Sequence, residues 1–141
     1  YYEKDNVVWE RTSNGDLKRS SMERDKYFNA IISKDNWIVE GSPRKSLKES
    51  FDSCDYIIVL DEYTAIRLVR VFRRWLNQRN GKEYYNTKPT IKFLCWNIKW
   101  VFEFNKTKRE ILQELSKYGN KVRIFKHSNG AFEFISQTYS C

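Results

Sequence analysis

The sequence predicts an α/β protein with a mainly parallel sheet. Two observations carry this prediction: short apolar runs end in acidic residues, and stretches with helical spacing of apolar side chains separate these runs. One run covers residues 37–39 and is followed by Glu40 and Gly41, and the other covers residues 56–60 and is followed by Asp61. The second run is rich in β-branched residues without polar alternation, which is typical of a strand covered on both faces.

A capping box, Ser20-x-x-Glu23, predicts the start of a helix that continues to about residue 34. The remaining elements are expected in this order: a helix over residues 45–53, a helix over 63–78 ended by Asn80-Gly81, a polar lid-like loop over 79–90, an aromatic helix over 90–104, a helix capped by Asn105 and stopped at Gly119, a strand over 122–125, and a helix opened by Ser128 or Asn129. No repeat or linker interrupts this order, so residues 1–141 are expected to form one domain.

Composition narrows the class of protein. With 40% hydrophobic residues the chain can bury a core, and 26 Lys and Arg against 18 Asp and Glu give a net charge of +8. This charge suits polyanionic ligands such as nucleotides, nucleic acid or an anionic surface. No stretch approaches the roughly 20 apolar residues of a membrane span, and a signal peptide pattern is missing, so we expect a cytoplasmic protein without a membrane partner. Three widely separated cysteines indicate reduced thiols rather than a disulfide framework or zinc site.

Several short motifs occur in the order known from one family. They are a Tyr-Tyr-x-x-Asp segment with a following Trp (Tyr1, Tyr2, Asp5, Trp9), a Trp-hydrophobic-hydrophobic-acidic-Gly segment (Trp37 to Gly41), an Asp-strand-Leu-Asp segment (Asp55 to Asp61), an Arg-x-x-x-Arg helix (Arg70, Arg74) and an aromatic segment leading to an arginine (Trp100, Phe102, Phe104, Arg109). Along essentially its whole length the chain resembles P-loop nucleotide kinases of the adenylate kinase type, and more closely the FlaR-related proteins called DNA topology modulation protein.

This resemblance implies a three-layer P-loop kinase-like fold that uses ATP and Mg²⁺. The chain departs from the family in one decisive respect, since none of its five glycines belongs to a G-x-x-x-x-G-K-[ST] phosphate loop. Without that loop the chain alone should not turn over ATP. The expectation is therefore a domain whose N-terminal strand and phosphate loop precede Tyr1 and are not in this sequence, or a relative that has kept the fold and lost the chemistry.

The candidate acidic and substrate-binding residues lie near predicted strand ends. Ligands of open parallel sheets bind outside the carboxyl ends of the strands, so Glu40 and Asp61 could hold the Mg²⁺ shell, with Asp61 the metal candidate, or orient an acceptor. The alternative is that each carboxylate caps the next helix. The turn Gly41-Ser-Pro-Arg44 resembles a turn of the family whose arginine contacts phosphate, and an ordinary turn explains it equally well. Asp5 with Trp9 could form a pocket for the acceptor base, and a packed indole explains Trp9 equally well.

The candidate catalytic residues are arginines. Arg70 and Arg74 lie one helical turn apart, with Arg73 beside them, and could neutralise a transferring phosphoryl group, as could Arg109. The alternatives are the solvated face of a helix and, for Arg109, a surface ion pair with a glutamate. The aromatic positions of residues 93–104 could stack on bases, but their helical spacing favours core packing.

Two functions follow from these features. The first is a nucleotide kinase-like protein that transfers the γ-phosphoryl group of ATP to a nucleotide or other small acceptor, working by positioning and charge stabilisation. The second is an inactive kinase-like scaffold that binds nucleic acid or a regulatory partner, as the net charge of +8 allows. The clustered arginines favour the first function, and no helix-turn-helix or zinc-finger motif supports the second.

Overall fold

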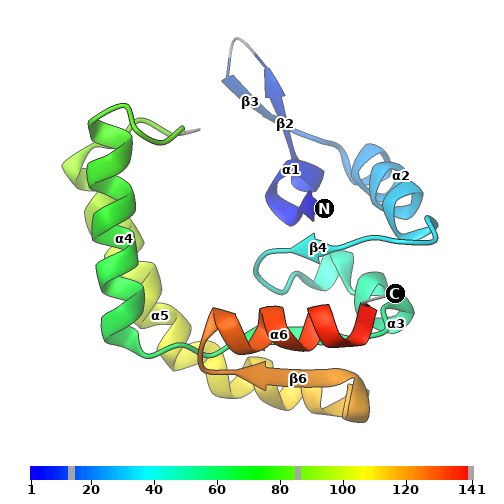
Figure 1. The fold of residues 1–141 in the computed structure, drawn as a ribbon. Helices are drawn as coiled ribbons and strands as arrows, with labels where there is room; N and C mark the ends of the chain where they lie inside the picture. The colour runs from blue at the N-terminus through cyan, green and yellow to red at the C-terminus, as the bar shows by residue number, and fades with distance from the viewer. Residues whose placement is uncertain (13–14, 85–86, 140–141) are drawn as a thin grey trace. The chain divides into compact units, whose positions relative to one another are not determined.

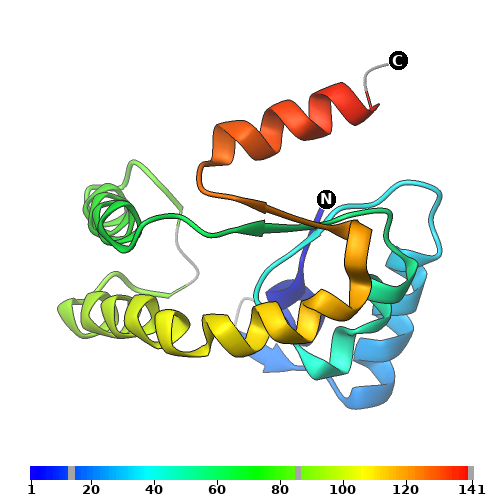
Figure 2. The ribbon, with the colours of Figure 1, turned by 90° about the horizontal axis from the view of Figure 1, so that it is seen from below.

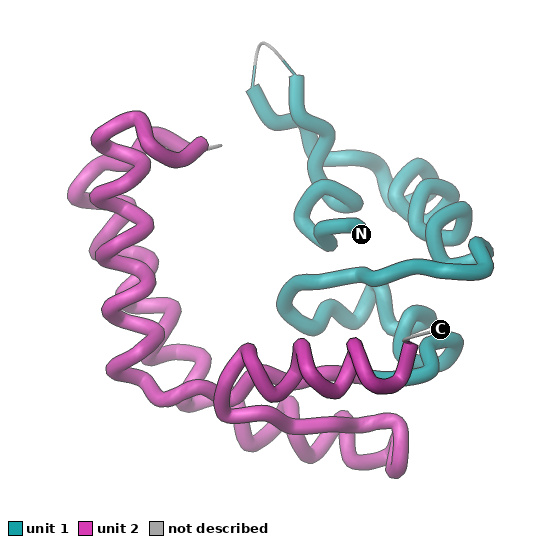
Figure 3. Tube along the Cα trace, viewed as in Figure 1, with its two compact units in different colours: residues 1–56 teal, residues 57–141 magenta. Residues whose placement is uncertain are grey.

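A computed structural model describes residues 1–12, 15–84 and 87–139 of the chain. The fold contains both helices and small sheets, so the predicted α/β class is confirmed. The chain divides into two compact units, Tyr1–Tyr56 and Ile57–Cys141, shown in two colours in Figure 3. Within the described residues the strands form three pairs, of which two are parallel and one is antiparallel.

The first unit contains short elements around one small core (Figure 1). In chain order they are β1 (Tyr2–Glu3), α1 (Lys4–Val8), β2 (Trp9–Thr12), β3 (Gly15–Lys18), α2 (Ser21–Ile32), β4 (Val39–Glu40), the 3-10 helix η1 (Lys45–Leu47) and α3 (Glu49–Ser53). β1 pairs with β4 in parallel, and β2 forms an antiparallel hairpin with β3. The core consists of Val7, Val8, Phe28, Ile31 and Leu47.

The capping box that the sequence predicts for α2 is present. The Ser20 hydroxyl accepts from the Glu23 backbone N–H, and the Glu23 carboxylate accepts from the Ser20 backbone N–H. These two hydrogen bonds satisfy backbone donors that a helix start otherwise leaves without partners. The helix therefore begins where local sequence alone places it.

The second unit contains a parallel strand pair and longer helices. Its elements are β5 (Ile57–Leu60), α4 (Thr64–Arg79), α5 (Ile91–Leu115), the 3-10 helix η2 (Ser116–Lys121), β6 (Val122–Phe125) and α6 (Ser128–Tyr139). β5 and β6 are in register from Ile57 opposite Val122 to Leu60 opposite Phe125. Figure 2 shows α6 on one side of this strand pair and α5 on the other. The strands at 57–60 and 122–125, the helix end at Asn80 and the terminal helix agree with the sequence prediction.

Two expectations for the region after residue 90 are wrong, and the first concerns the ends of the helices. The helix does not break at Asn105 but runs without interruption from Ile91 to Leu115, with Thr90 as its cap. The Asn105 side chain instead bonds to α4, where it donates to the Thr64 hydroxyl at 3.0 Å and accepts from Arg67. Because these partners lie on a neighbouring helix, the asparagine has no need to cap its own backbone.

The aromatic side chains of α5 are not all packed in a core. Phe93 and Phe104 are half-buried, whereas Trp96, Trp100 and Phe102 are exposed. The inward stripe of α5 consists of other residues, Leu94, Val101 and Leu115, which are separated by multiples of seven. A helix of 25 residues has more apolar positions than this stripe can bury, so three aromatic rings face outward.

Neither of the cysteines in the described residues is in a disulfide: Cys54 is half-buried and Cys95 is exposed. Cys141 lies outside the described residues. No helix in the described ranges is both long enough and apolar enough to cross a lipid bilayer.

Candidate functional site

The carboxyl ends of β5 and β6 bring oppositely charged residues together. Asp61 follows β5 directly and Lys126 follows β6 directly, and because the strands are parallel both residues lie at the same edge. The Asp61 backbone N–H donates to the Phe125 carbonyl at 2.8 Å, which extends the strand pairing by one residue. The strand geometry therefore fixes the position of both side chains.

Asp61 is the buried centre of this edge. Its side chain is only 8% exposed, and each carboxylate oxygen accepts from one ammonium group: Oδ1 from Lys108 at 2.9 Å and Oδ2 from Lys126 at 2.5 Å. The hydrogen bond from Lys126, assisted by Lys108, holds the pKa of Asp61 below its usual value, although burial acts in the opposite direction. Asp61 is therefore ionised at neutral pH and binds both lysines.

A second buried carboxylate lies next to the first. Glu62 is buried and accepts a hydrogen bond from the Arg70 guanidinium, which is itself more than half exposed. We call Asp61, Glu62, Arg70, Lys108 and Lys126 the cationic edge. In each pair the carboxylate lies inside and the cation reaches outward, so the edge presents three positive groups to solvent.

The predicted catalytic arginines of α4 lie together. Arg70, Arg73 and Arg74 line an open hollow of about 520 Å³, and Glu83 on its wall forms an ion pair with Arg74 at 3.3 Å. Arg109 is exposed on α5 and does not line this hollow. The structure therefore brings two of the three predicted catalytic arginines to one surface, next to the cationic edge through Arg70.

The start of the proposed lid-like loop is attached to the end of α4. The Lys82 backbone N–H donates to the Asn77 carbonyl at 2.8 Å, and the buried Gln78 amide donates to the Tyr84 carbonyl at 3.3 Å. Residues 85 and 86 of the loop lie outside the described residues. The first part of this loop therefore lies against the end of α4, next to the hollow that the arginines line.

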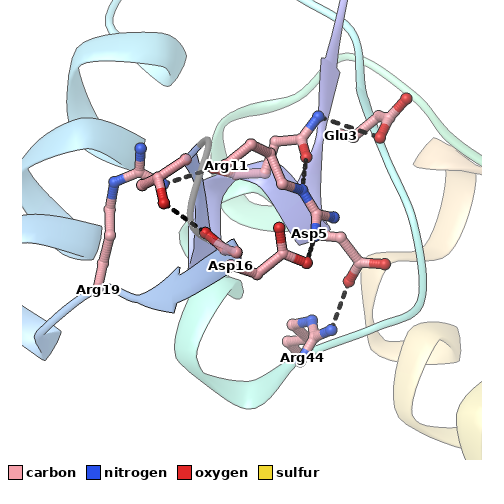
Figure 4. A network of polar contacts seen from close by, with 9 residues as sticks. Glu3, Asp5, Arg11, Asp16, Arg19 and Arg44 are labelled. Atoms are coloured by element: carbon pink, nitrogen blue, oxygen red, sulfur yellow. Dashed lines mark hydrogen bonds and ion pairs between the residues drawn. The ribbon is translucent and has the colours of Figure 1, made fainter. Parts of the chain in front are cut away.

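In the first unit, two predicted substrate-binding residues meet. The Arg44 guanidinium lies 2.6 Å from the Asp5 carboxylate, and both side chains are exposed enough to reach a ligand (Figure 4). Gly41 has a φ of +123°, and a Cβ at this position would lie 3.1 Å from the Cβ of Lys4. A residue with a side chain would be strained here, so glycine allows the chain to pass Lys4 closely.

The other two predicted residues of this unit have different surroundings. Glu40 is exposed and accepts from the Tyr1 hydroxyl at 2.5 Å, which raises the pKa of Tyr1 to about 12. Trp9 is half-buried and packs against the core of the first unit, which agrees with the alternative of a packed indole. The structure therefore brings Asp5, Gly41 and Arg44 together near Lys4, but does not add Trp9 or Glu40 to them.

Lys4 is a buried cation that the sequence interpretation missed. It is 4% exposed, and its ammonium lies 4.5 Å from the centroid of the Phe51 ring. Burial lowers the pKa of Lys4, and the positive charge of Arg44 lowers it further. Nothing in the sequence indicates this burial, because lysine side chains are almost never fully buried.

The residues around Asp61 do not fit a magnesium ion. Mg²⁺ needs free oxygen ligands, whereas both oxygens of this carboxylate hold ammonium groups, whose charge repels a cation. In the described part of the chain no group of three or more His, Cys, Asp or Glu side chains is arranged to hold a metal ion. A cradle for the β- and γ-phosphates of ATP is also missing from the sequence, since it has no phosphate-loop motif. No catalytic step through either group follows from this chain.

Sequence reasoning missed the two lysines of the cationic edge, although a signal existed for each. Lys126 directly follows a predicted strand, so the rule that pointed to Asp61 also applies to it. Lys108 lies seven residues after Val101 and seven before Leu115, which places it on the inward stripe of an unbroken α5. The expected break at Asn105 concealed this spacing.

Comparisons with known proteins identify no relative. Protein-family models, curated proteins and solved structures all give no match to this chain. The kinase-like interpretation therefore depends on the residues themselves.

Proposed function

We propose that this protein is nucleotide kinase-like and binds the phosphate groups of a nucleotide at the cationic edge. The observation that carries the proposal is the pair of lysines held by one buried aspartate at the carboxyl end of two parallel strands. This edge of an open α/β sheet is where such folds bind their ligands.

The ion pairs leave the lysines able to bind an anion. An ammonium group has three donors, and Lys108 and Lys126 each give one to Asp61. The Lys126 side chain is 54% exposed, so its remaining donors can reach a phosphate oxygen. Arg70 adds a planar guanidinium, which suits phosphate geometry. Asp61 and Glu62 orient the three cations before the ligand arrives, which lowers the entropic cost of binding.

Phosphoryl transfer to a nucleotide or other small acceptor is the finer part of the proposal. The resemblance of Arg70, Arg74 and Arg109 to kinase arginines supports it, as does the pair Asp5 and Arg44 near Gly41. Transfer with ATP and Mg²⁺ would need a phosphate loop, which this sequence does not contain. We place the protein in the cytoplasm as part of the same proposal, because nucleotide kinases work on dissolved substrates.

Isothermal titration calorimetry with inorganic pyrophosphate and with ATP, both without Mg²⁺, tests the binding proposal. The variant Lys108→Gln/Lys126→Gln should bind each ligand at least about tenfold more weakly, because one charge-assisted hydrogen bond contributes about 1.4 kcal/mol or more. Lys26→Gln is the matched control, since Lys26 is an exposed lysine of α2.

Two results would contradict the proposal. One is equal affinity of the double variant and the native protein, which would place the phosphates elsewhere. The other is a native protein that binds neither ligand at millimolar concentration. Circular dichroism of the double variant checks that its helices are intact, because Asp61 loses both ionic partners in it.

A further inference from the structure

The outward face of α5 combines exposed aromatic rings with lysines. Trp96, Trp100 and Phe102 are 54%, 55% and 49% exposed, respectively. At about 100° per residue, Trp96 lies roughly opposite the buried residues Leu94 and Val101, and Trp100 lies beside Trp96, whereas Phe102 lies on another side of the helix. The rings of Trp96 and Trp100 are therefore not needed to bury the helix, and large exposed apolar side chains in a group mark interaction sites.

The spacing places the rings and the cations in one strip. Lys92 and Trp100 are each four residues from Trp96, and Lys99 is three residues from it, so these side chains share one face of the helix. Lys106, seven residues after Lys99, extends this face by two turns, whereas Phe102 is two residues from Trp100 and points to another side of the helix. We call Lys92, Trp96, Lys99, Trp100 and Lys106 the aromatic strip.

The charge of the strip suits a polyanion. All three lysines are exposed, and the acidic residue on the same face, Glu103, forms a 3.6 Å ion pair with Lys99. An exposed pair of this kind contributes little and is easily exchanged for another anion. The net charge of +8 and the sequence pI of about 9.4 add long-range attraction in the same direction.

We propose that the aromatic strip of α5 binds single-stranded nucleic acid. Unpaired bases stack on aromatic rings, and phosphates between them are neutralised by neighbouring cations, so alternating rings and lysines match both parts of the ligand. A duplex hides its base faces and would leave the rings without a partner. A protein partner with an apolar surface would use the rings but leave three lysines to be desolvated.

The site is separate from the cationic edge. Lys108 lies on the inward stripe of α5, whereas Trp96 and Trp100 lie on the outward face. This inference goes beyond the proposed function, and either proposal can fail without the other.

Fluorescence anisotropy of labelled oligothymidylate and oligouridylate, each of about 12 nucleotides, tests the proposal, since this length matches the site sizes of known single-strand binders. Trp96→Ala/Trp100→Ala should weaken binding by roughly 5- to 150-fold for each base that loses its ring. Phe132→Ala is the matched control, because Phe132 is an aromatic residue of α6 that is 72% exposed. It should change the affinity less than about twofold.

The salt dependence provides an independent measurement. Log affinity falls by about 0.7 per phosphate contact for each tenfold increase in salt, so Lys92→Gln/Lys99→Gln should reduce the slope by about 1.4. Similar affinity for both oligonucleotides supports base stacking that is common to DNA and RNA. A clear preference for one of them identifies the kind of nucleic acid that the strip binds.

Three results would overturn the proposal. They are unchanged binding by the double tryptophan variant, stronger binding of a duplex of the same length, and retention only on vesicles that contain phosphatidylserine. The Lys108→Gln/Lys126→Gln variant should keep most of its oligonucleotide affinity, and loss of that affinity would move the site to the cationic edge.

Discussion

Both units of this protein pair short parallel strands and place a carboxylate near a strand end, but the two carboxylates differ in burial. Glu40 in the first unit is exposed and takes one phenol hydroxyl as partner. Asp61 in the second unit is buried and takes two ammonium groups. Since burying a charge is costly unless it is paired, the buried carboxylate gathers cations around it and the exposed one does not. Burial therefore concentrates positive charge at one strand end.

The largest expected effect comes from removing the buried carboxylate charge. Asp61→Asn should lower the free energy of unfolding by about 2–3 kcal/mol, because it leaves Lys108 and Lys126 beside a neutral amide. The loss stays below that of a fully buried pair because both ammonium groups are partly exposed to water. Glu40→Gln is the matched variant in the first unit and should cost less than about 0.5 kcal/mol. Urea denaturation measures both, and equal effects would remove the distinction between the two strand ends.

The same comparison predicts a difference in acid. The pKa of Asp61 is lowered in the folded state, so its contribution to stability is fully present above the unfolded value of about 4. It is lost as the pH falls through the lower folded value, because the unfolded chain then binds the proton first. Native protein should therefore lose stability more steeply below pH ~4 than Asp61→Asn does. Parallel slopes in urea titrations at several pH values would contradict this assignment.

A smaller effect tests the close approach of backbone and side chain in the first unit. Gly41→Ala should cost about 2 kcal/mol, since it combines an unfavourable positive φ with a 3.1 Å contact to the Lys4 Cβ. Gly15→Ala is the control, because Gly15 has a similar φ, of +118°, but a Cβ at this position would meet no atom within 4 Å. The control should cost about 1 kcal/mol, and thermal unfolding of the two variants separates the contact from the backbone strain.

The smallest expected effect concerns the buried cation of the first unit. Lys4→Met should raise the free energy of unfolding by about 1 kcal/mol, because burial disfavours the charged lysine and methionine has a similar volume. Lys26→Met on the surface of α2 should leave stability within about 0.5 kcal/mol.

The pH dependence offers a second measurement of the same group. The folded pKa of Lys4 is lowered, so the unfolded chain binds more protons between that value and about 10.4, and native stability should rise with pH there. This rise should be absent in Lys4→Met. A variant less stable than the native protein at pH 7 would show that the ammonium contributes to the fold through its contact with Phe51.

Local sequence predicted the elements whose signals are local. The capping box of Ser20 and Glu23, the apolar strand at residues 57–60 and the helix end at Asn80-Gly81 are all where short-range patterns placed them. The hairpin of β2 and β3 was missed, although the sequence Asn14-Gly15, at which β3 begins, is a turn signal. The prediction of a helix break at Asn105 was wrong because the Asn105 side chain has its partners on α4, and no local pattern reveals such partners.

The sequence by itself therefore determined the class of fold, the net positive charge and the acidic residue at the end of β5, since these depend on composition and on neighbours along the chain. Only the tertiary structure decided what surrounds that acidic residue. Lys108 and Lys126 are 47 and 65 residues from Asp61 and meet it because α5 is unbroken and β6 is parallel to β5. Contacts of this kind arise from packing over long separations, which the spacing of residues along one segment does not encode.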